Sequence, residues 1–392
     1  MQRTVYFDYN ATTPLDPAVR EAMLPFLGDL AGGSWGNPSS VHHVGRKARA
    51  LLDDARDRAA KLLGAKPSEI IFTSGGTEAN NLAIFGMARH LKSRGKHLIT
   101  SSVEHHAVLQ CFDYLAKNEG FLVTKLSADR DGRISVEDLK KAIRPDTILV
   151  SVMAANNEIG TIQPAAELGA VCRERGIAFH SDAVQWFGKE PFTGVSQFNA
   201  QLVTICAHKF HGPKGAGVLY IQSPLHPDPI LFGGAHENER RAGTENLAAI
   251  IGMVEAMEQF VNRPVFIRKN LEPLKVKLID SIVKIDGCEV VSPRDNCLAN
   301  TVSFVVRGSD GIALMAGLDM EGICASSGSA CSAGSLEPSH VILATGRSEA
   351  ANSLVRFSLG RSSTLEEVEF VCSVLPEVIR RAQRSGKAPS SL

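Results

Sequence analysis

The sequence lacks several features that would place it in a special class of protein. Lysine and arginine total 42, and aspartate and glutamate also total 42, so no basic excess favours nucleic acid or an anionic membrane as a partner. No signal peptide begins the chain, and no apolar run is long enough to span a membrane, which predicts a cytoplasmic protein. Internal repeats and long low-complexity segments are missing as well.

The cysteines lack the spacing of a metal or redox motif. Eight are present, and no two of them form a CxxC pair. A zinc ribbon and a thioredoxin-type site are therefore not indicated. In a chain without a signal peptide we expect reduced thiols that are mostly buried, so a cysteine with special chemistry has to be recognised from its surroundings.

Short β-branched runs alternate with amphipathic stretches through the middle of the chain. The predicted strands are Ile70–Phe72, His97–Ser101, Thr147–Val152, Ala178–His180, Leu202–Ile205 and Val218–Ile221. The predicted helices are Val44–Leu63, Thr77–Arg94, Ala107–Asn118, Val136–Ile143 and Ala165–Arg175. This alternation predicts an α/β fold, with a mostly parallel central sheet flanked by helices on both faces. Ligands bind such sheets beyond the carboxyl ends of the strands.

The pattern changes after about Gly252. A helix at Met253–Val261 is followed by Pro264, then by short strands at Cys288–Val291 and Thr301–Val306 with helices near the end. This composition indicates a second, smaller α+β unit. We expect a large cofactor-binding domain over residues 13–262, and a small domain formed by residues 1–12 and 263–392.

The segment Thr73–Glu78 has the composition of an anion-binding turn. It joins a predicted strand to a predicted helix and contains Gly75, Gly76 and Thr77. Small residues let backbone N–H groups approach an anion, and a helix N-terminus favours negative charge. The alternative is a plain capped helix start with Thr77 as the N-cap.

Polar side chains follow several other predicted strands. They are His105, Asn157, Asp182, Gln185 and Lys209. Each has an ordinary alternative when taken alone, such as a turn asparagine or a solvated loop lysine. Together with the anion-binding segment they match the needs of pyridoxal-5′-phosphate (PLP), whose aldehyde needs a lysine, whose pyridine nitrogen needs a carboxylate and whose ring needs a flat partner.

A metal site is the alternative use of the histidines. His208 and His211 flank Lys209, but no carboxylate–cysteine set completes a coordination sphere around them. His105 and His106 are adjacent in sequence, so their side chains point in different directions and do not suit a chelating pair. We therefore predict a cofactor site without a metal.

The order of these motifs resembles that of a known family. The matching stretches are Phe7–Thr13, Gly36–Ser40, Ser74–Asn81, Glu104–His105, Asn156–Gly160, Asp182–Gln185, His208–Lys209, Arg240–Thr244 and Ser326–Ser332. They are similar to those of the NifS/IscS-type cysteine desulfurases, in the class V aminotransferase group of fold-type I PLP enzymes. The resemblance continues to about residue 361 and implies a homodimeric enzyme that acts on L-cysteine.

The resemblance implies a role for each residue around the cofactor ring. Lys209 would carry PLP covalently and move protons, and Asp182 would pair with the pyridine nitrogen. His105 would stack on the ring, and Asn157 and Gln185 would contact the side of the phenolic oxygen.

It also implies the contacts to the phosphate. Gly76, Thr77 and His208 would bind the phosphate within one chain, and Thr244 would reach the cofactor of the partner subunit. Cys206 stands where relatives commonly have a serine beside the phosphate. This departure touches cofactor contacts only lightly.

Substrate binding and sulfur transfer complete the implied site. Arg356, in a strand-like stretch, would clamp the substrate carboxylate, because a planar guanidinium binds carboxylates in a bidentate manner. Asn37 is a further substrate-binding candidate. Cys331 lies in the Ser/Gly/Ala-rich segment Ala325–Gly334, which has little to anchor it and is expected to be mobile. The resemblance implies that the Cys331 thiol takes the sulfur as a persulfide and that L-alanine is released.

Three alternatives stay open at this point. A class V aminotransferase would need no thiol in a mobile segment, and a selenocysteine lyase would differ only in substrate preference. A non-catalytic scaffold with a decayed site is disfavoured by the intact Lys209, Asp182 and Cys331. Two kinds of sulfur acceptor fit the resemblance: an iron–sulfur scaffold protein, with a cluster received at Cys331 as one further role, or another thiolation partner.

Overall fold

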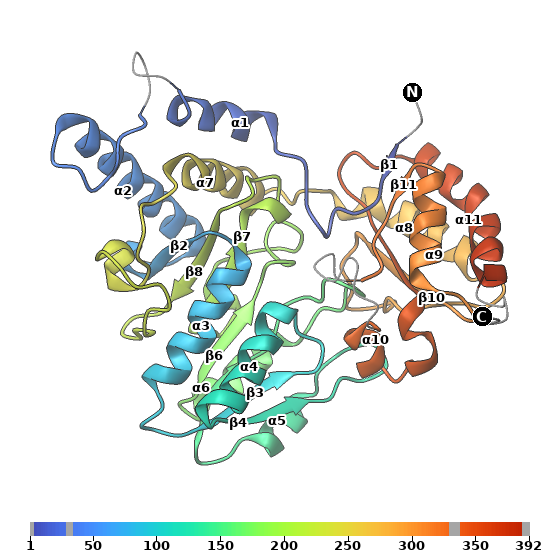
Figure 1. The fold of residues 1–392 in the computed structure, drawn as a ribbon, viewed down its shortest axis with the longest axis horizontal. Helices are drawn as coiled ribbons and strands as arrows, with labels where there is room; N and C mark the ends of the chain where they lie inside the picture. The colour runs from blue at the N-terminus through green and yellow to red at the C-terminus, as the bar shows by residue number, and fades with distance from the viewer. Residues whose placement is uncertain (1–3, 29–33, 329–337, 386–392) are drawn as a thin grey trace, which may run out of the picture.

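The computed structural model describes residues 4–28, 34–328 and 338–385, and its core is a seven-stranded sheet (Figure 1). The strands are β2 (Ile70–Thr73), β3 (His97–Ser101), β4 (Leu122–Leu126), β5 (Thr147–Ser151), β6 (Ala178–Asp182), β7 (Leu202–Cys206) and β8 (Gly217–Ile221). Their spatial order is β2-β8-β7-β6-β5-β3-β4, and only β8 runs antiparallel to its neighbours. The predicted α/β fold with a mostly parallel sheet is therefore confirmed.

Helices cover both faces of this sheet. They are α2 (His43–Leu63), α3 (Gly76–His90), α4 (His106–Glu119), α5 (Val136–Ala142), α6 (Ala165–Glu174) and α7 (Leu247–Val261). Alternate strand residues pack into two apolar clusters, with Ile71 on the side of α3 and α4 and its neighbours Ile70 and Phe72 on the other side. Because both faces are buried, the central strands carry apolar side chains on both sides, although β3 and β6 also contain buried polar residues.

Strand β4 was not among the predicted strands. It lies at the edge of the sheet and pairs only with β3 among the described strands. Its residues are mostly half-buried or exposed, and Lys125 lies within it. An edge strand with this mixed pattern lacks the apolar run that identifies the central strands.

A second, antiparallel sheet lies beside the first body (Figure 1). Its strands are β12 (Leu354–Ser358), β10 (Thr301–Val306) and β9 (Cys288–Val290), in that order. The helices of this half are α8 (Arg268–Ile282), α9 (Gly311–Met320), α10 (His340–Ala344) and α11 (Leu365–Ser385). No helix of the described part of the chain has both the length and the apolar character needed to cross a membrane.

The N-terminal segment joins the C-terminal half before the chain enters the large sheet. Strand β1 (Val5–Tyr6) pairs in parallel with β11 (Ile323–Cys324), and Asp8 forms a bridge with Ser358 of β12. Helix α1 (Pro17–Met23) then packs against α7 in the first body. The division into a large and a small domain stays a prediction. It requires the N-terminal residues to pack with the C-terminal half, and the pairing of β1 with β11 is a contact of this kind.

Candidate active site

A cavity opens at the carboxyl ends of β2, β3, β5, β6 and β7. Its walls bring together residues from segments that are distant in the sequence. They are Asn10, Ala11, Gly76, Thr77, Asn80, His105, Met153, Ala155, Asn157, Asp182, Val184, Gln185, Cys206, His208, Lys209 and Arg356. The cavity therefore contains most of the site residues predicted from the sequence, at the sheet edge where α/β proteins bind ligands.

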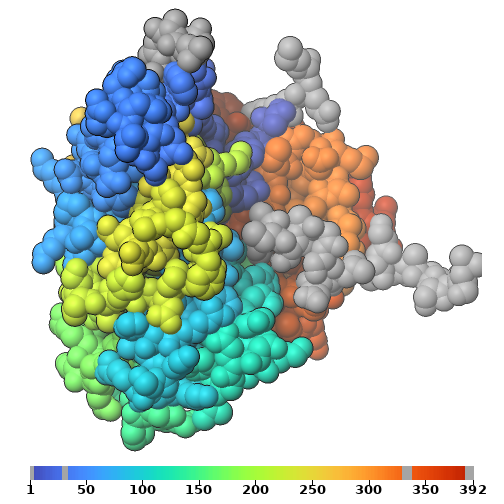
Figure 2. All heavy atoms as spheres, turned by 60° about the vertical axis from the view of Figure 1, so that its left-hand side comes forward, coloured from blue at the N-terminus to red at the C-terminus, as the bar shows by residue number. Residues whose placement is uncertain are grey.

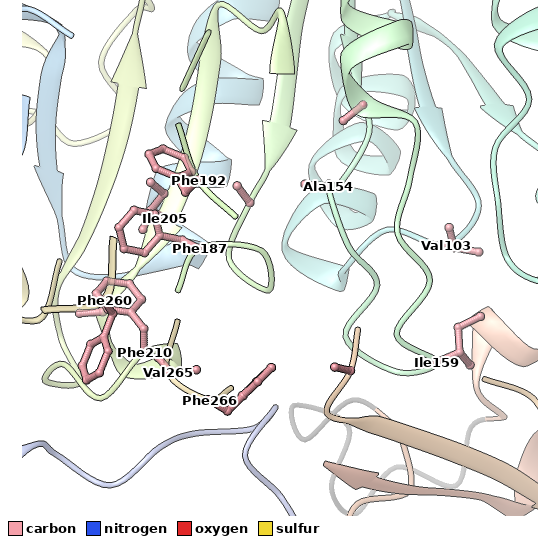
Figure 3. Packing of buried hydrophobic residues seen from close by; sticks show 14 of the residues in the cluster. Val103, Ala154, Ile159, Phe187, Phe192, Ile205, Phe210, Phe260, Val265 and Phe266 are labelled. Atoms are coloured by element: carbon pink, nitrogen blue, oxygen red, sulfur yellow. The ribbon is translucent and has the colours of Figure 1, made fainter. Parts of the chain in front are cut away.

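Lys209 lies in a short 3₁₀ turn, Ala207–Lys209, that directly follows β7. The next residue, Phe210, is fully buried, and its ring centroid is 4.8 Å from that of Phe187 (Figure 3). This aromatic packing fixes the turn. The Nζ of Lys209 donates hydrogen bonds to the backbone oxygens of Asn10 and Ala11, both at 2.7 Å. A primary amine is thus held at a defined place in the cavity wall.

Asp182 supplies a buried carboxylate at the end of β6. Its side chain accepts hydrogen bonds from the backbone N–H of Val184 at 2.9 Å and from Nδ2 of Asn80 at 2.7 Å. Burial raises the pKa of this carboxyl, against the lowering effect of its two donors and of the Lys209 charge. Both hydrogen-bond donors are neutral, so a protonated ring nitrogen in the cavity would be a favourable partner for this carboxylate.

The turn before α3 has the geometry of an anion cradle. Helix α3 begins at Gly76, with Gly75 as its N-cap and no side-chain hydrogen bond to the cap. The alternative with Thr77 as the N-cap is therefore wrong, because Thr77 lies inside the first turn and lines the cavity. A Cβ on Gly76 would come within 3.0 Å of Val184 and 3.4 Å of Cys206. Glycine is therefore the residue that fits there without displacing a neighbour. The backbone N–H groups at the start of α3 have no side-chain cap and are suited to bind a phosphate.

Cys206 forms part of the floor under this cradle. Its side chain is buried, and its Sγ is 3.8 Å from the backbone oxygen of Ala216. Burial raises the pKa of the thiol, which therefore stays protonated at neutral pH. The residue is held in place by its surroundings, as a cofactor contact would require.

Two histidines in the cavity wall are uncharged at neutral pH. Nδ1 of His105 accepts a hydrogen bond from the backbone N–H of Ala107 at 3.0 Å, so His105 is the N-cap of α4. Burial, reinforced by the charge of Lys209, lowers the pKa of His105 to about 4 and that of His208 to about 3. A neutral imidazole with a fixed orientation is suited to stack against a flat ring.

Arg356 reaches the cavity from β12 of the second sheet. It is 1% exposed, so it is not an ordinary surface charge. Its Nη2 is 2.6 Å from Oδ1 of Asp8, and its Nη1 donates to the backbone oxygens of Asn157 and Gly328 at 2.9 and 2.7 Å. The Nε atom is buried without a partner among the described atoms, so the guanidinium retains a donor for a further ligand.

Two predicted residues are described by the structure but do not line this cavity. Thr244 is exposed. It belongs to the segment between β8 and α7, which is yellow in Figure 2 and lies at the surface of the molecule. Asn37 is also exposed, and its Oδ1 accepts a hydrogen bond from the backbone N–H of Ser39 at 2.8 Å. Neither lines the cavity of its own chain. Cys331 lies outside the described residues.

The structure adds residues that sequence reasoning did not single out. Asn10 and Asn80 line the cavity, and Lys189 lies behind it with its amine bonded to Gln185. Asn10 belongs to the stretch Phe7–Thr13 that matches the family, so the resemblance could have indicated it as a site residue. No local pattern marks Lys189, a single lysine in a turn.

Comparison with known proteins agrees with this geometry. Residues 5–371 match the family model described as aminotransferase class-V. Cysteine desulfurase IscS of Dictyoglomus turgidum is 47% identical over 383 residues, which cover 97% of this chain and 96% of that protein. Putative cysteine desulfurase IscS 1 of Bacillus subtilis is 41% identical over 380 residues, covering 96% and 99% of the two proteins.

Solved structures with the same architecture are also similar in sequence. A structure described as a NifS-like protein superposes with a TM-score of 0.88 at 36% identity and covers 97% of this chain and 100% of its own. The structure of SspA in complex with cysteine superposes with a TM-score of 0.79 at 36% identity and covers 92% and 100% of the two chains.

Proposed function

Because the chain belongs to the aminotransferase class-V family, as a cysteine desulfurase of the IscS/NifS type, we propose that Lys209 carries PLP and that Cys331 receives the sulfur of L-cysteine. The reaction releases L-alanine. The observation that supports the cofactor assignment most strongly is a lysine amine, a buried carboxylate and an anion cradle facing one cavity. These groups are complementary to the aldehyde, the ring nitrogen and the phosphate of PLP.

The residues of the cavity divide the binding of PLP between them. Asp182 would pair with the ring nitrogen, and His105 would stack on the ring. Gly76, Thr77 and His208 would hold the phosphate at the start of α3, where the helix dipole favours negative charge. When bound, PLP supplies an electron sink for negative charge that develops at the substrate's α-carbon.

Lys209 and Arg356 act on the substrate. The Arg356 guanidinium would bind the substrate carboxylate, since it is buried in the cavity wall with one Nε donor still available. The Nζ of Lys209, steered by the oxygens of Asn10 and Ala11, would take the α-proton as a general base.

Sulfur transfer is assigned to Cys331 by its place in the motif Ser326–Ser332. The Cys331 thiolate would attack the substrate sulfur, so that a sulfur–sulfur bond forms as the carbon–sulfur bond breaks. The carbon fragment leaves as L-alanine after protonation. The persulfide would then pass to an acceptor, either an iron–sulfur scaffold protein or another thiolation partner. A homodimer and a cytoplasmic location belong to the same proposal.

The roles of the two residues can be separated experimentally. Purified wild type should bind PLP and release alanine from cysteine, and Lys209→Ala should lose the absorbance of the bound cofactor together with turnover. Cys331→Ser should retain that absorbance but form no persulfide on the enzyme and negligible alanine. Mass spectrometry after treatment with labelled cysteine locates the added sulfur. A wild-type rate in Cys331→Ser would show that the nucleophile lies elsewhere.

A further inference from the structure

Lys189 is a buried lysine directly behind the cavity. It is 4% exposed and follows β6 in the same turn as Gln185. Its Nζ donates hydrogen bonds to Oδ1 of Asn10 at 2.7 Å and to Oε1 of Gln185. Both acceptors are neutral amide oxygens that belong to residues of the cavity wall.

The charges around Lys189 do not compensate it. The adjacent Glu190 is turned toward Arg268, with 2.6 Å between Oε1 and Nη2. Burial lowers the pKa of Lys189 well below its ordinary value, and the positive charges of Lys209 and Arg356 lower it further, against the weaker effect of Glu190. Burying an amine without a carboxylate partner costs folding free energy, so we expect Lys189 to have a functional role.

The amine determines how the amide of Gln185 is oriented. Nζ of Lys189 donates hydrogen bonds to both Asn10 and Gln185, so the atom of Gln185 that faces it is the oxygen. The Nε2 group then faces away from Lys189, and one of its hydrogens is donated to the backbone oxygen of Asn10 at 3.0 Å. An amide nitrogen has two hydrogens, so a second donor is available on the side of the cavity.

The backbone oxygen of Asn10 connects Lys209, the proposed cofactor lysine, to the same hydrogen-bond network. The backbone oxygen of Asn10 accepts from both Gln185 Nε2 and Lys209 Nζ. The side chain of Asn10 accepts from Lys189 through Oδ1 and donates through Nδ2 to Thr301 Oγ1 at 2.9 Å. Lys189 thus fixes the side chains that surround Lys209 without entering the cavity itself.

We propose that Lys189 is a positioning residue of the reaction, which holds the Gln185 amide with its N–H donors toward the phenolic oxygen of the cofactor. The inference rests on the proposed function, because Gln185 is assigned to that side of the PLP ring. Without Lys189, the hydrogen bond from Nε2 to the backbone oxygen of Asn10 is the one described contact that still opposes turning of the Gln185 amide, and a turned amide would present its oxygen. The negatively charged phenolic oxygen would then lose a donor.

The pH titration of the bound cofactor's absorbance measures this effect without turnover. A donor to the phenolic oxygen favours the deprotonated form of the bound cofactor, so its loss raises the midpoint pH of the absorbance change. In Lys189→Met we expect a rise of about 0.5 to 1 pH unit, which corresponds to one neutral hydrogen bond. Lys189→Gln keeps the site polar but is one atom shorter, so it should shift the midpoint in the same direction.

Lys275→Met is the matched control. Lys275 is 9% exposed, and its Nζ donates to the backbone oxygen of Leu298 at 3.0 Å and to Sγ of Cys297 at 3.3 Å, outside the cavity wall. Its loss should lower thermal stability but leave the midpoint at the wild-type pH. A change in stability alone therefore does not account for a shift in Lys189→Met.

A double-mutant cycle tests whether Lys189 acts through Gln185. If it does, Gln185→Leu and the double variant Lys189→Met/Gln185→Leu should have the same midpoint, because the second change removes nothing more. Additive shifts, or a wild-type midpoint in both Lys189 variants, would overturn the inference. A wild-type protein that binds no PLP would instead refute the proposed function, so the two failures are distinguishable.

Discussion

Burial sets the protonation state of single residues in the cavity. His105 is held neutral because its ring is buried near the charge of Lys209, which lowers its pKa to about 4. In the unfolded chain a histidine titrates near pH 6.5. Between these two values the unfolded state binds a proton that the folded state does not bind. The stability due to the neutral His105 is therefore fully present above about pH 6.5 and declines as the pH falls toward 4.

Replacing His105 should reduce this pH dependence. His105→Asn keeps an N-cap for the Ala107 N–H but removes the titrating ring. We expect the free energy of unfolding of the cofactor-free variant to fall less steeply between pH 6.5 and 4.5, by up to about 1.4 kcal/mol per pH unit. Urea unfolding at several pH values measures the slope. His43→Asn, at an exposed histidine, is the control, and equal slopes in His105→Asn and wild type would contradict the assignment.

At the scale of elements, the carboxylate of Glu78 helps to hold the turn between β2 and α3. Glu78 accepts a hydrogen bond from the backbone N–H of Ser74 at 2.8 Å through Oε2. Its Oε1 accepts from Nε of Arg241 at 2.7 Å, so the cradle is also tied to the segment that carries Thr244. A change at Glu78 should therefore alter the cradle without touching the cofactor directly.

The variant Glu78→Gln should bind PLP more weakly. A glutamine oxygen in the place of Oε2 could still accept from Ser74, but the NH₂ group would then face Nε of Arg241 and the charge of the ion pair would be lost. We expect the dissociation constant for PLP to rise roughly tenfold, equivalent to about 1.4 kcal/mol. Titration of the cofactor-free protein with PLP measures it. Glu119→Gln breaks the Arg89–Glu119 pair, which is not part of the cavity, and should bind PLP like wild type. Equal affinities of the two variants for PLP would contradict this role of Glu78.

At the scale of the whole molecule, the cavity depends on segments from both halves of the chain. Arg356 comes from the second sheet, whereas Asp182 and Lys209 come from the first. The N-terminal segment connects the two halves through Asn10. This residue forms hydrogen bonds with Ser358 and Thr301 of the C-terminal half, and with Gln185 and Lys209 of the large sheet's half. The site is therefore expected to form only when both halves are folded together.

The proposed dimer can be tested by complementation. Thr244 is exposed and does not line its own cavity, so a role at the phosphate requires a second copy of the chain. Thr244→Ala and Lys209→Ala should each be impaired as homodimers. A mixed dimer would contain one site with an intact Lys209 from one chain and an intact Thr244 from the other. Activity should therefore reappear when the two variants are unfolded, mixed and refolded. No recovery in verified mixed dimers would contradict a role in trans.

The sequence alone was sufficient for the central architecture and for most of the cavity. Strands such as His97–Ser101 and Thr301–Val306 were predicted with the observed bounds, because short runs with β-branched residues are visible locally. The residues after the strands, from Gly76 to Lys209, could be predicted to lie together, since parallel strands end at one edge of a sheet. These are properties of short segments and of simple topology.

Only the tertiary structure decided the contacts between distant segments. Strand β1 has two residues and exists through its pairing with β11, more than 300 residues later. The hydrogen bond between Asn10 and Gln185 joins residues that are 175 positions apart in the sequence, and the hydrogen bond between Asn10 and Lys189 joins residues 179 positions apart. Enclosure by these residues lowers the pKa of Lys189, and the orientation of Gln185 depends in turn on Lys189. Burial and hydrogen-bond direction are properties of the folded surroundings, so a lone lysine in a turn carries no local signal of either.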